Sequence, residues 1–421
     1  MWRGPALSDS RRPPRPRKGG IIEVVALGIY ISVPFCKTKC SYCNFASDVF
    51  SRAVFDRYVD RVCADVASAP QIAEDMRARF DCEVDSIYLG GGTPTVLDAG
   101  QLSRIFDVVR SQFQVRPDAE VTVECAPGTI GPEVLQGLLR CGVNRVSLGV
   151  QSFVDAEAAA VGRLHKRSTV LEDIARLRAA GITNLNIDLI AGLPHQTAES
   201  WQHSLDETLA TGAPHVSVYM LEVDEDSRLG REVMAGGARY HAHFVPDEEA
   251  TADFYLAACE QLGAAGVAQY EISNFARSGA ESRHNLKYWT RRPYLGFGVD
   301  AHSMLAAAMP GAEAVRFATA DAPEKYVAGS PLQSTVVSHA AALEEAFFLG
   351  LRLNRGVALG RVAGTFGQPA VDDLSPLITE LVADGLLQCD ADCVRLTPRG
   401  RLLSNEVFQR FLATPDVPTQ A

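Results

Sequence analysis

The sequence predicts an α/β fold, an incomplete (β/α)6 barrel followed by a small winged-helix-like domain. Six short apolar runs alternate with amphipathic helical patterns between residues 21 and 266. Strict alternation of this kind indicates parallel strands joined by right-handed crossovers. Polar residues also follow several of the apolar runs, as expected for a barrel that carries its functional groups at the C-terminal ends of its strands.

The length and composition indicate a globular chain with one large domain and one smaller one. The chain has 421 residues, of which 47% are hydrophobic, and a net charge of −11. The negative charge disfavours general binding of nucleic acid. No apolar stretch approaches the roughly 20 residues that span a bilayer, so we expect no transmembrane segment. Ten cysteines without a signal-peptide pattern indicate reduced thiols and a cytoplasmic location.

The chain is predicted to begin with a disordered basic tail over residues 1–20, which is rich in Pro and Arg. The barrel then occupies residues 21–266. Its expected strands are short runs rich in apolar and β-branched residues. They cover residues 28–33, 84–89, 120–124, 145–150, 184–190 and 215–220.

Helical patterns fill the intervals between these strands. Residues 51–67, for example, carry Val54, Tyr58 and Val62 on one helical face. The other expected helices cover residues 101–113, 132–141, 169–180, 198–211 and 247–265. Glycines at the ends of several of these helices suit the left-handed cap position.

Two further segments follow the barrel. Residues 267–337 are predicted to close it, and they contain the motif His284-Asn-Leu-Lys-Tyr-Trp289. Residues 338–421 form the winged-helix-like domain, with helices over 343–353 and 374–384, a hairpin over 385–396 and a last helix over 399–411. Because the chain and the hairpin are acidic, we expect this domain to pack or to dock a partner rather than to bind DNA.

Three cysteines lie within eight residues directly after the first strand, at Cys36, Cys40 and Cys43. A loop can aim three sulfurs at one point, and a cubane [4Fe–4S] cluster normally takes four Cys ligands. Three ligands would leave one iron with an open coordination site, which indicates chemistry rather than electron storage. A zinc site is the alternative, but it prefers a repeated pair of closely spaced ligands.

The spacing C-x3-C-x2-C, with an aromatic residue before the last Cys, resembles that of the radical S-adenosylmethionine (SAM) enzymes. The resemblance extends to one branch of that family, which contains the oxygen-independent coproporphyrinogen III oxidases and the radical SAM haem chaperones. It rests on Gly90-Gly-Gly-Thr-Pro94, Glu124, Gly149-Val-Gln-Ser-Phe153, Arg163, Asn186-Ile-Asp-Leu-Ile-Ala-Gly-Leu-Pro194 and His284-Asn-Leu-Lys-Tyr-Trp289. It covers about residues 29 to 411, and it implies a radical SAM barrel.

The resemblance also implies how SAM is bound. The amino and carboxylate groups of SAM would chelate the open iron, and Arg163 would hold the carboxylate, for which a guanidinium is well suited. The remaining SAM contacts would come from the glycine motif (Gly91, Gly92 and Thr93), from Glu124, Gln151 and Asp188 along the methionine and ribose, from Tyr30 beside the cluster and from Tyr42 on the adenine. Taken singly, each of these residues is more often a surface, capping or core residue.

The motif at 284–289 would contact haem. His284 is the candidate axial ligand, and Asn285, Tyr288 and Trp289 offer polar and stacking contacts. His302 on a later loop is the alternative ligand. A lone histidine is usually a structural hydrogen-bonding group, so the residue types alone do not decide between these roles.

Two departures favour the haem chaperone over the oxidase. Phe45 stands where the oxidase carries an additional Cys, and only about 26 residues precede the first strand, where the oxidase has a longer extension. We therefore expect a protein that binds a [4Fe–4S] cluster, SAM and haem, and that delivers haem to an acceptor protein. A reductant protein would serve the cluster, and transient contact with a membrane protein is compatible with this role. The alternatives are the oxidase, which converts propionates to vinyls, and a non-catalytic scaffold.

Overall fold

The structure, a computed structural model, describes residues 25–412, and the predicted tail over residues 1–20 lies outside them. Within this range one large sheet contains twelve strands, in the order β12-β11-β10-β9-β1-β2-β3-β4-β5-β6-β8-β7. The run from β9 to β6 is parallel throughout. Its strands are β1 (Leu27–Val33), β2 (Glu83–Gly91), β3 (Gln114–Cys125), β4 (Arg145–Gln151), β5 (Asn184–Ala191), β6 (His215–Met220) and β9 (Tyr294–Phe297). The predicted α/β fold, an incomplete barrel, is confirmed.

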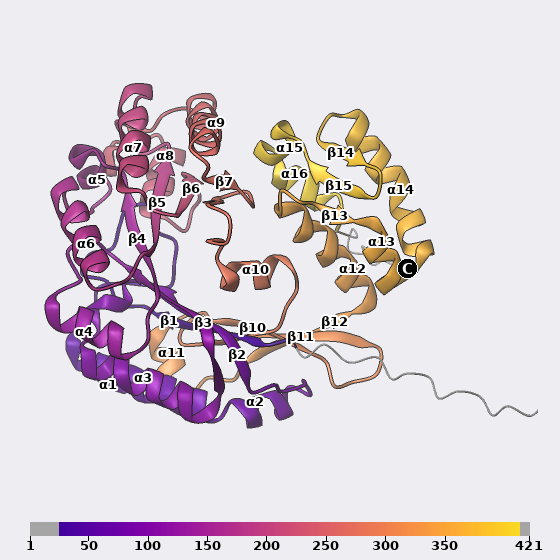
Figure 1. The fold of residues 1–421 in the computed structure, drawn as a ribbon, viewed down its shortest axis with the longest axis horizontal. Coiled ribbons are helices and arrows are strands. Elements are labelled where there is room, and N and C mark those ends of the chain that lie inside the picture. The colour runs from indigo at the N-terminus through magenta and orange to yellow at the C-terminus, as the bar shows by residue number, and fades with distance from the viewer. Residues whose placement is uncertain (1–24, 413–421) are drawn as a thin grey trace, which may run out of the picture.

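Helices pack along the outer face of the parallel strands (Figure 1). They are α1 (Phe55–Ala67), α2 (Ala69–Asp75), α3 (Ala99–Gln112), α4 (Pro132–Arg140), α5 (Asp155–Ala160), α6 (Arg167–Ala179), α7 (Ala198–Thr211) and α9 (Glu248–Ala264). The first of them buries Tyr58, Val59 and Val62 against the sheet, in the helical spacing that its sequence shows. Helix α3 begins before the predicted position because Asp98 and Gln101 form a capping box at its N-terminus.

The segment after α9 extends the sheet at both edges. The edge beyond β6 gains β8 (Asn274–Ala276) and β7 (Ala268–Gln269), and the edge beyond β9 gains β10 (His302–Ala306), β11 (Ala312–Ala318) and β12 (Gln333–Ser338). This segment also contains two short helices, α10 (Arg283–Trp289) and α11 (Pro323–Val327), and a third, α8 (Arg228–Met234), lies between β6 and α9. In Figure 1, α10 lies between the barrel and the C-terminal domain.

The C-terminal domain has its own core and a second, three-stranded sheet in the order β13-β15-β14. Its elements are α12 (His339–Phe348), β13 (Val357–Ala358), α13 (Leu359–Phe366), α14 (Gln368–Ala383), β14 (Leu387–Asp390), β15 (Cys393–Leu396), α15 (Pro398–Leu402) and α16 (Ser404–Gln409). The hairpin was predicted, whereas α13 was not. The single last helix was wrong, because Leu403 leaves the helical conformation (φ −106°, ψ 30°) and separates α15 from α16.

The inward-facing side chains of the parallel strands are largely polar. Buried examples are Glu120 on β3, Arg145 on β4, Asn186 on β5 and His215 on β6. Closed (β/α) barrels normally fill this space with branched apolar residues. Here the interior instead opens into a cavity of about 900 Å³, a size typical of pockets that hold a sizeable ligand.

One buried tyrosine joins three parts of the barrel. The Tyr58 hydroxyl on α1 donates to the carbonyl oxygen of Ser32 (2.8 Å) and accepts from the backbone N–H of Val299 (2.8 Å). We expect Tyr58→Phe to lower the free energy of unfolding by about 1–3 kcal/mol, because it leaves two buried backbone groups unpaired. Denaturant unfolding measures this. Tyr240→Phe is the control, since the Tyr240 hydroxyl makes no hydrogen bond to the described residues, and its effect should stay within about 0.5 kcal/mol. Equal effects of the two substitutions would contradict this account.

Candidate functional site

The three loop cysteines line one end of the cavity, together with the glycine turn that follows β2. All three are partly buried. The ammonium group of Lys39 braces the loop, because it donates to the carbonyl oxygens of Phe45 (2.7 Å) and Ser47 (2.6 Å). The sequence therefore supplies both the sulfurs and a side chain that folds the loop around them.

The sulfurs are close enough to affect one another. Burial raises the pKa of the Cys36 thiol, and the nearby Cys43 and Cys40 sulfurs raise it further against hydrogen bonds from Thr93 and Ser47. No three His, Cys, Asp or Glu side chains within residues 25–412 are arranged to hold a single metal ion. Three Cys sulfurs on one loop are the ligand type that iron–sulfur clusters take.

The glycine turn at the end of β2 needs its glycines. Gly91 has a φ of +99°, which side chains rarely adopt. A Cβ at Gly92 would lie 2.8 Å from the carbonyl oxygens of Val33 and Phe35 and 3.0 Å from the Cys36 sulfur. The turn thus lets backbone N–H groups approach the cysteine loop closely.

Glu124, at the end of β3, lies beside this turn. Its carboxylate accepts hydrogen bonds from the Tyr88 hydroxyl (2.8 Å) and from the Gly91 backbone N–H (3.1 Å). Burial raises its pKa to about 7, and the nearby Asp188 contributes to the rise. A carboxyl group with this pKa can gain or lose a proton near neutral pH, and it would pair well with a cationic amino group.

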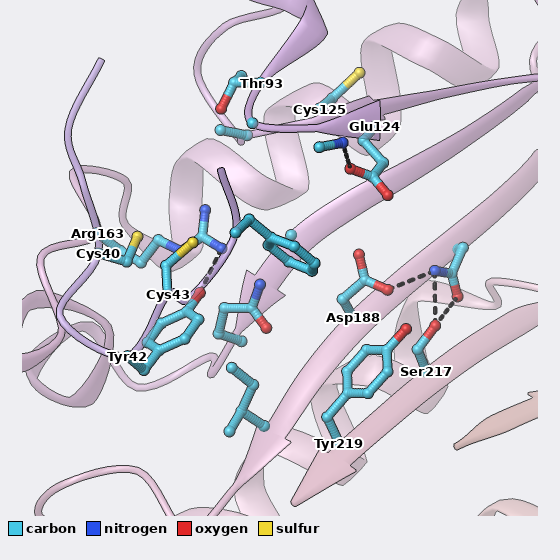
Figure 2. Close-up of a pocket in the computed structure, with 18 of the residues that line it drawn as sticks. Cys40, Tyr42, Cys43, Thr93, Glu124, Cys125, Arg163, Asp188, Ser217 and Tyr219 are labelled. Atoms are coloured by element: carbon cyan, nitrogen blue, oxygen red, sulfur yellow. Dashed lines mark hydrogen bonds between the residues drawn. The ribbon is translucent and has the colours of Figure 1, made fainter. Parts of the chain in front are cut away.

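Asp188, on β5, is held by two neighbours. It accepts from the Ser147 hydroxyl (2.9 Å) and from the Asn186 amide (2.7 Å), and burial raises its pKa. The network continues through His215, whose ring contacts the Asn186 amide oxygen (2.6 Å) and the Tyr270 hydroxyl (3.0 Å). Figure 2 shows Asp188 and Glu124 across the cavity from Tyr42 and Cys43.

Arg163 lies in the connection between α5 and α6 and contacts the cysteine loop from there. Its guanidinium donates to the Tyr42 hydroxyl (2.7 Å), while its Nε has no partner among the described residues. Gln151 next to it has a φ of +69° and an amide oxygen that is also unpaired. A Cβ at Gly149 would lie 3.2 Å from both side chains. Unpaired, cramped polar groups of this kind suit a bound polar ligand.

The cavity thus gathers most of the residues that the sequence singled out for the cluster and SAM, from Cys36, Cys40 and Tyr42 to Arg163 and Asp188. Tyr30 is the exception, because it does not line the cavity. Its ring lies beside the rings of Tyr88 and His284, at centroid distances of 6.1 and 6.4 Å. Sequence reasoning missed the roles of Tyr88, Arg145, Asn186, His215, Ser217 and Tyr219. The signal that could have found them is a polar residue at alternate, inward-facing strand positions.

Comparisons with known proteins agree with this geometry. The chain matches the model of the radical SAM superfamily over residues 30–208 and that of the HemN C-terminal domain over residues 337–403. It is 35% identical to the heme chaperone HemW of Bacillus subtilis, with 91% of this chain and 98% of that protein covered. The chain belongs to the HemW family of radical SAM proteins. The HemW of Lactococcus lactis is 33% identical over 91% of this chain and 96% of its own length.

A solved structure shares the fold of this HemW family member. Coproporphyrinogen III oxidase (HemN) from Escherichia coli has a TM-score of 0.77 with it, at 24% identity, and the match covers 92% of this chain and 90% of that one. Across residues 25–412, no helix is both long and apolar enough to cross a membrane.

The 284–289 motif of this HemW family member forms α10, and His284 points into the protein interior. One ring nitrogen contacts the Ser86 hydroxyl (3.1 Å) and the other contacts the Tyr288 hydroxyl (2.8 Å). Burial lowers the pKa of His284 to about 3, so the ring is neutral. With both nitrogens engaged, His284 has no lone pair directed at a ligand in this arrangement.

The other motif residues divide between the cavity and the C-terminal domain. Asn285 lines the cavity. The ring of Trp289 stacks under the guanidinium of Arg352, 4.2 Å from its centre. The alternative histidine, His302, has a side chain that is 70% exposed and lies near Asp300 (3.8 Å). Of the residues predicted to contact haem, Asn285 lines the cavity, whereas His284, Tyr288, Trp289 and His302 do not.

The raised pKa of Glu124 predicts a pH-dependent stability. The folded-state pKa of about 7 lies above the ordinary value, so the wild type loses stability as pH rises from about 4.5 to 7. Gln cannot ionise, and the Tyr88 hydroxyl can turn to accept from its amide. The free energy of unfolding of Glu124→Gln, relative to that of the wild type, should therefore rise by on the order of 2 kcal/mol when the pH is raised from 5 to 8. Denaturant unfolding at both pH values measures this, with the exposed Glu222→Gln as control. A difference that does not change with pH would refute the assignment.

His284 should contribute to the free energy of unfolding even when no ligand is bound. His284→Ala removes a buried ring and leaves two hydroxyls without a partner, so we expect a loss of about 2–4 kcal/mol. His302→Ala, at an exposed position, should change stability by no more than about 0.5 kcal/mol. Thermal unfolding of both variants without added ligand provides the comparison. A His284→Ala variant as stable as the wild type would argue against the structural role.

Proposed function

We propose that this chain binds a [4Fe–4S] cluster, SAM and haem, and that it passes haem to an acceptor protein in the cytoplasm. The observation that carries the proposal is the single cavity lined by the loop cysteines and by the polar strand-end residues. Its HemW relatives are named heme chaperones and match nearly the full length of the chain. The reductant protein and the haem acceptor are further partners in this proposal.

The cluster would be held by Cys36, Cys40 and Cys43. When bound, it supplies an open iron that the amino and carboxylate groups of SAM chelate. The protein's contribution is to place ligands around that iron. The unpaired Nε of Arg163 supports a role in holding the SAM carboxylate, and the carboxylate of Glu124 beside Gly91 supports a role near the SAM amino group.

The remaining SAM contacts follow from the same arrangement. Asp188 is oriented by Ser147 and Asn186, and a fixed carboxylate of this kind suits a ribose diol. Tyr42, held by Arg163, offers a ring for the adenine. Tyr30 would act behind the glycine turn, since a Cβ at Gly91 would lie 3.5 Å from the Tyr30 hydroxyl.

Phe45 favours haem delivery over decarboxylation. It follows the last cluster cysteine, lines the cavity mouth and is 64% exposed. By resemblance, the oxidase carries a Cys at this position, and an exposed aromatic ring instead offers an apolar contact for a macrocycle. Within the 284–289 motif, Asn285 lines the cavity and would contact the ligand directly. Trp289 would contribute indirectly, because it stacks under Arg352, which also lines the cavity. Of the two candidate histidines, His302 is the exposed one, so an iron contact there would break no buried hydrogen bond.

The role given to Arg163 can be tested by SAM binding. Arg163→Ala would leave the SAM carboxylate without its charge-assisted partner, a loss of roughly 1.5–3 kcal/mol, which is at least a tenfold weaker Kd. Isothermal titration of the reconstituted protein measures it. Lys37→Gln removes an exposed cation from the same cavity wall and should leave the Kd within about twofold. Equal affinities of Arg163→Ala and wild type would remove Arg163 from the site.

The function itself is tested by two parallel assays on reconstituted protein. Under anaerobic conditions with SAM, reductant and coproporphyrinogen III, we expect no protoporphyrinogen IX. In the second assay, haem titration should give a saturable Soret shift, which His302→Ala should alter. Formation of protoporphyrinogen IX would show that the chain is an oxidase, and the absence of any Soret shift would refute haem binding.

A further inference from the structure

Three residues near the N-terminal ends of the barrel interior, a region called the floor below, carry polar atoms that have no hydrogen-bond partners. Thr122, Arg145 and Asn184 lie side by side on β3, β4 and β5, in direct register. Registered neighbours in a parallel sheet point to the same face, and here that face is the barrel interior. Among the described residues, the Thr122 hydroxyl, the Asn184 amide oxygen and two nitrogens of Arg145 make no hydrogen bond.

Arg145 is the unusual member of this group, because its side chain is only 2% exposed and lines the cavity. Its nearest carboxylate is that of Glu120, 3.9 Å from Nε, which is beyond hydrogen-bond length. Glu120 is already engaged, since it accepts from the Ser282 hydroxyl and from two backbone N–H groups at the start of α10. Nε and Nη2 of the buried guanidinium therefore remain without an acceptor.

The other charged groups of the interior do not use these donors. Asp188 is satisfied by Ser147 and Asn186, and Glu124 by Tyr88 and Gly91. His215 is neutral, because burial and the Arg145 charge lower its pKa well below the ordinary value. The buried guanidinium has one carboxylate at 3.9 Å, but two of its nitrogens make no hydrogen bond. Leaving buried polar groups unpaired is costly, and each such group calls for an explanation, of which a ligand is one.

The anion that Arg145 would bind is not the SAM carboxylate. The guanidinium of Arg163 lies over Gly149, and Arg145 precedes Gly149 by four residues on the same strand. At about 3.3 Å per residue, the two backbone positions are roughly 13 Å apart. The two guanidinium groups thus belong to opposite ends of the strand, and a SAM carboxylate placed at Arg163 leaves Arg145 for another anion.

We propose that Arg145 binds a propionate carboxylate of the haem that enters the cavity. This inference rests on the proposed function and names how that site would recognise its cargo. Haem is apolar except for its iron and its propionates, and a planar guanidinium matches a carboxylate with two parallel hydrogen bonds. The unpaired Thr122 hydroxyl, beside Arg145 on β3, would add a donor for the same carboxylate.

The test compares haem with its dimethyl ester, in which both propionates are uncharged. Soret titrations of the reconstituted full chain should show that the wild type prefers haem by roughly tenfold or more. Arg145→Gln should lose that preference, and Lys37→Gln should keep it. SAM affinity, measured separately, should be unchanged in Arg145→Gln.

Several outcomes would overturn the proposal. Equal preference in wild type and Arg145→Gln would show that the propionates bind elsewhere. A loss of SAM affinity in Arg145→Gln would assign the anion to SAM. Arg145→Lys, which retains the charge, should give an intermediate preference and guards against misfolding of the Gln variant. If the wild type binds neither haem nor its ester, the proposed function itself fails.

Discussion

Two backbone hydrogen bonds between neighbouring strand ends position the rest of the site. The N–H groups of Gly92 and Thr93 donate to the carbonyl oxygens of Val33 and Phe35, each at 2.8 Å. They join the turn after β2 to the point where the cysteine loop leaves β1, and only glycine at position 92 leaves room for them. The same turn directs the Gly91 N–H to Glu124. The loop, the turn and the end of β3 therefore form one unit, set by main-chain geometry rather than by side-chain packing.

A polar barrel interior is costly to build, and the chain offsets that cost selectively. The strand-end carboxylates each receive at least two hydrogen bonds, for example Asp188 from Ser147 and Asn186. Stability comes instead from the apolar layer between the outer face of the sheet and its helices, where residues such as Ile29 and Leu102 are fully buried. The fold thus separates its stabilising core from its hollow, polar side, and groups left unpaired on that side mark ligand positions.

Local pattern predicted the barrel strands and the cysteine loop well, because both depend on residues close together in the sequence. Features that depend on distant segments could not be predicted in this way. The pairing of β9 with β1 leaves no periodic signal in either strand. The motif at 284–289 has the residue types of a haem contact, but the hydroxyls of Ser86 and Tyr288 form hydrogen bonds with both ring nitrogens of His284. The sequence around Arg145 gives no sign of a special role, and only the register of β4 with β3 shows that its side chain lies on the floor of the cavity.

The position of α10 explains why this motif combines a buried histidine with large aromatic residues. Glu120 of the barrel holds the start of the helix, and the Lys287 ammonium pairs with Asp85 of β2 at 2.6 Å. At the other end, Trp289 supports Arg352 of the C-terminal domain, and Arg352 lines the cavity with Ser404 and Asn405. The helix is thus fastened to the barrel on one side and carries a wall residue of the second domain on the other. A motif with this placement shapes the cavity by fixing one domain against the other, and this role does not depend on iron binding by His284.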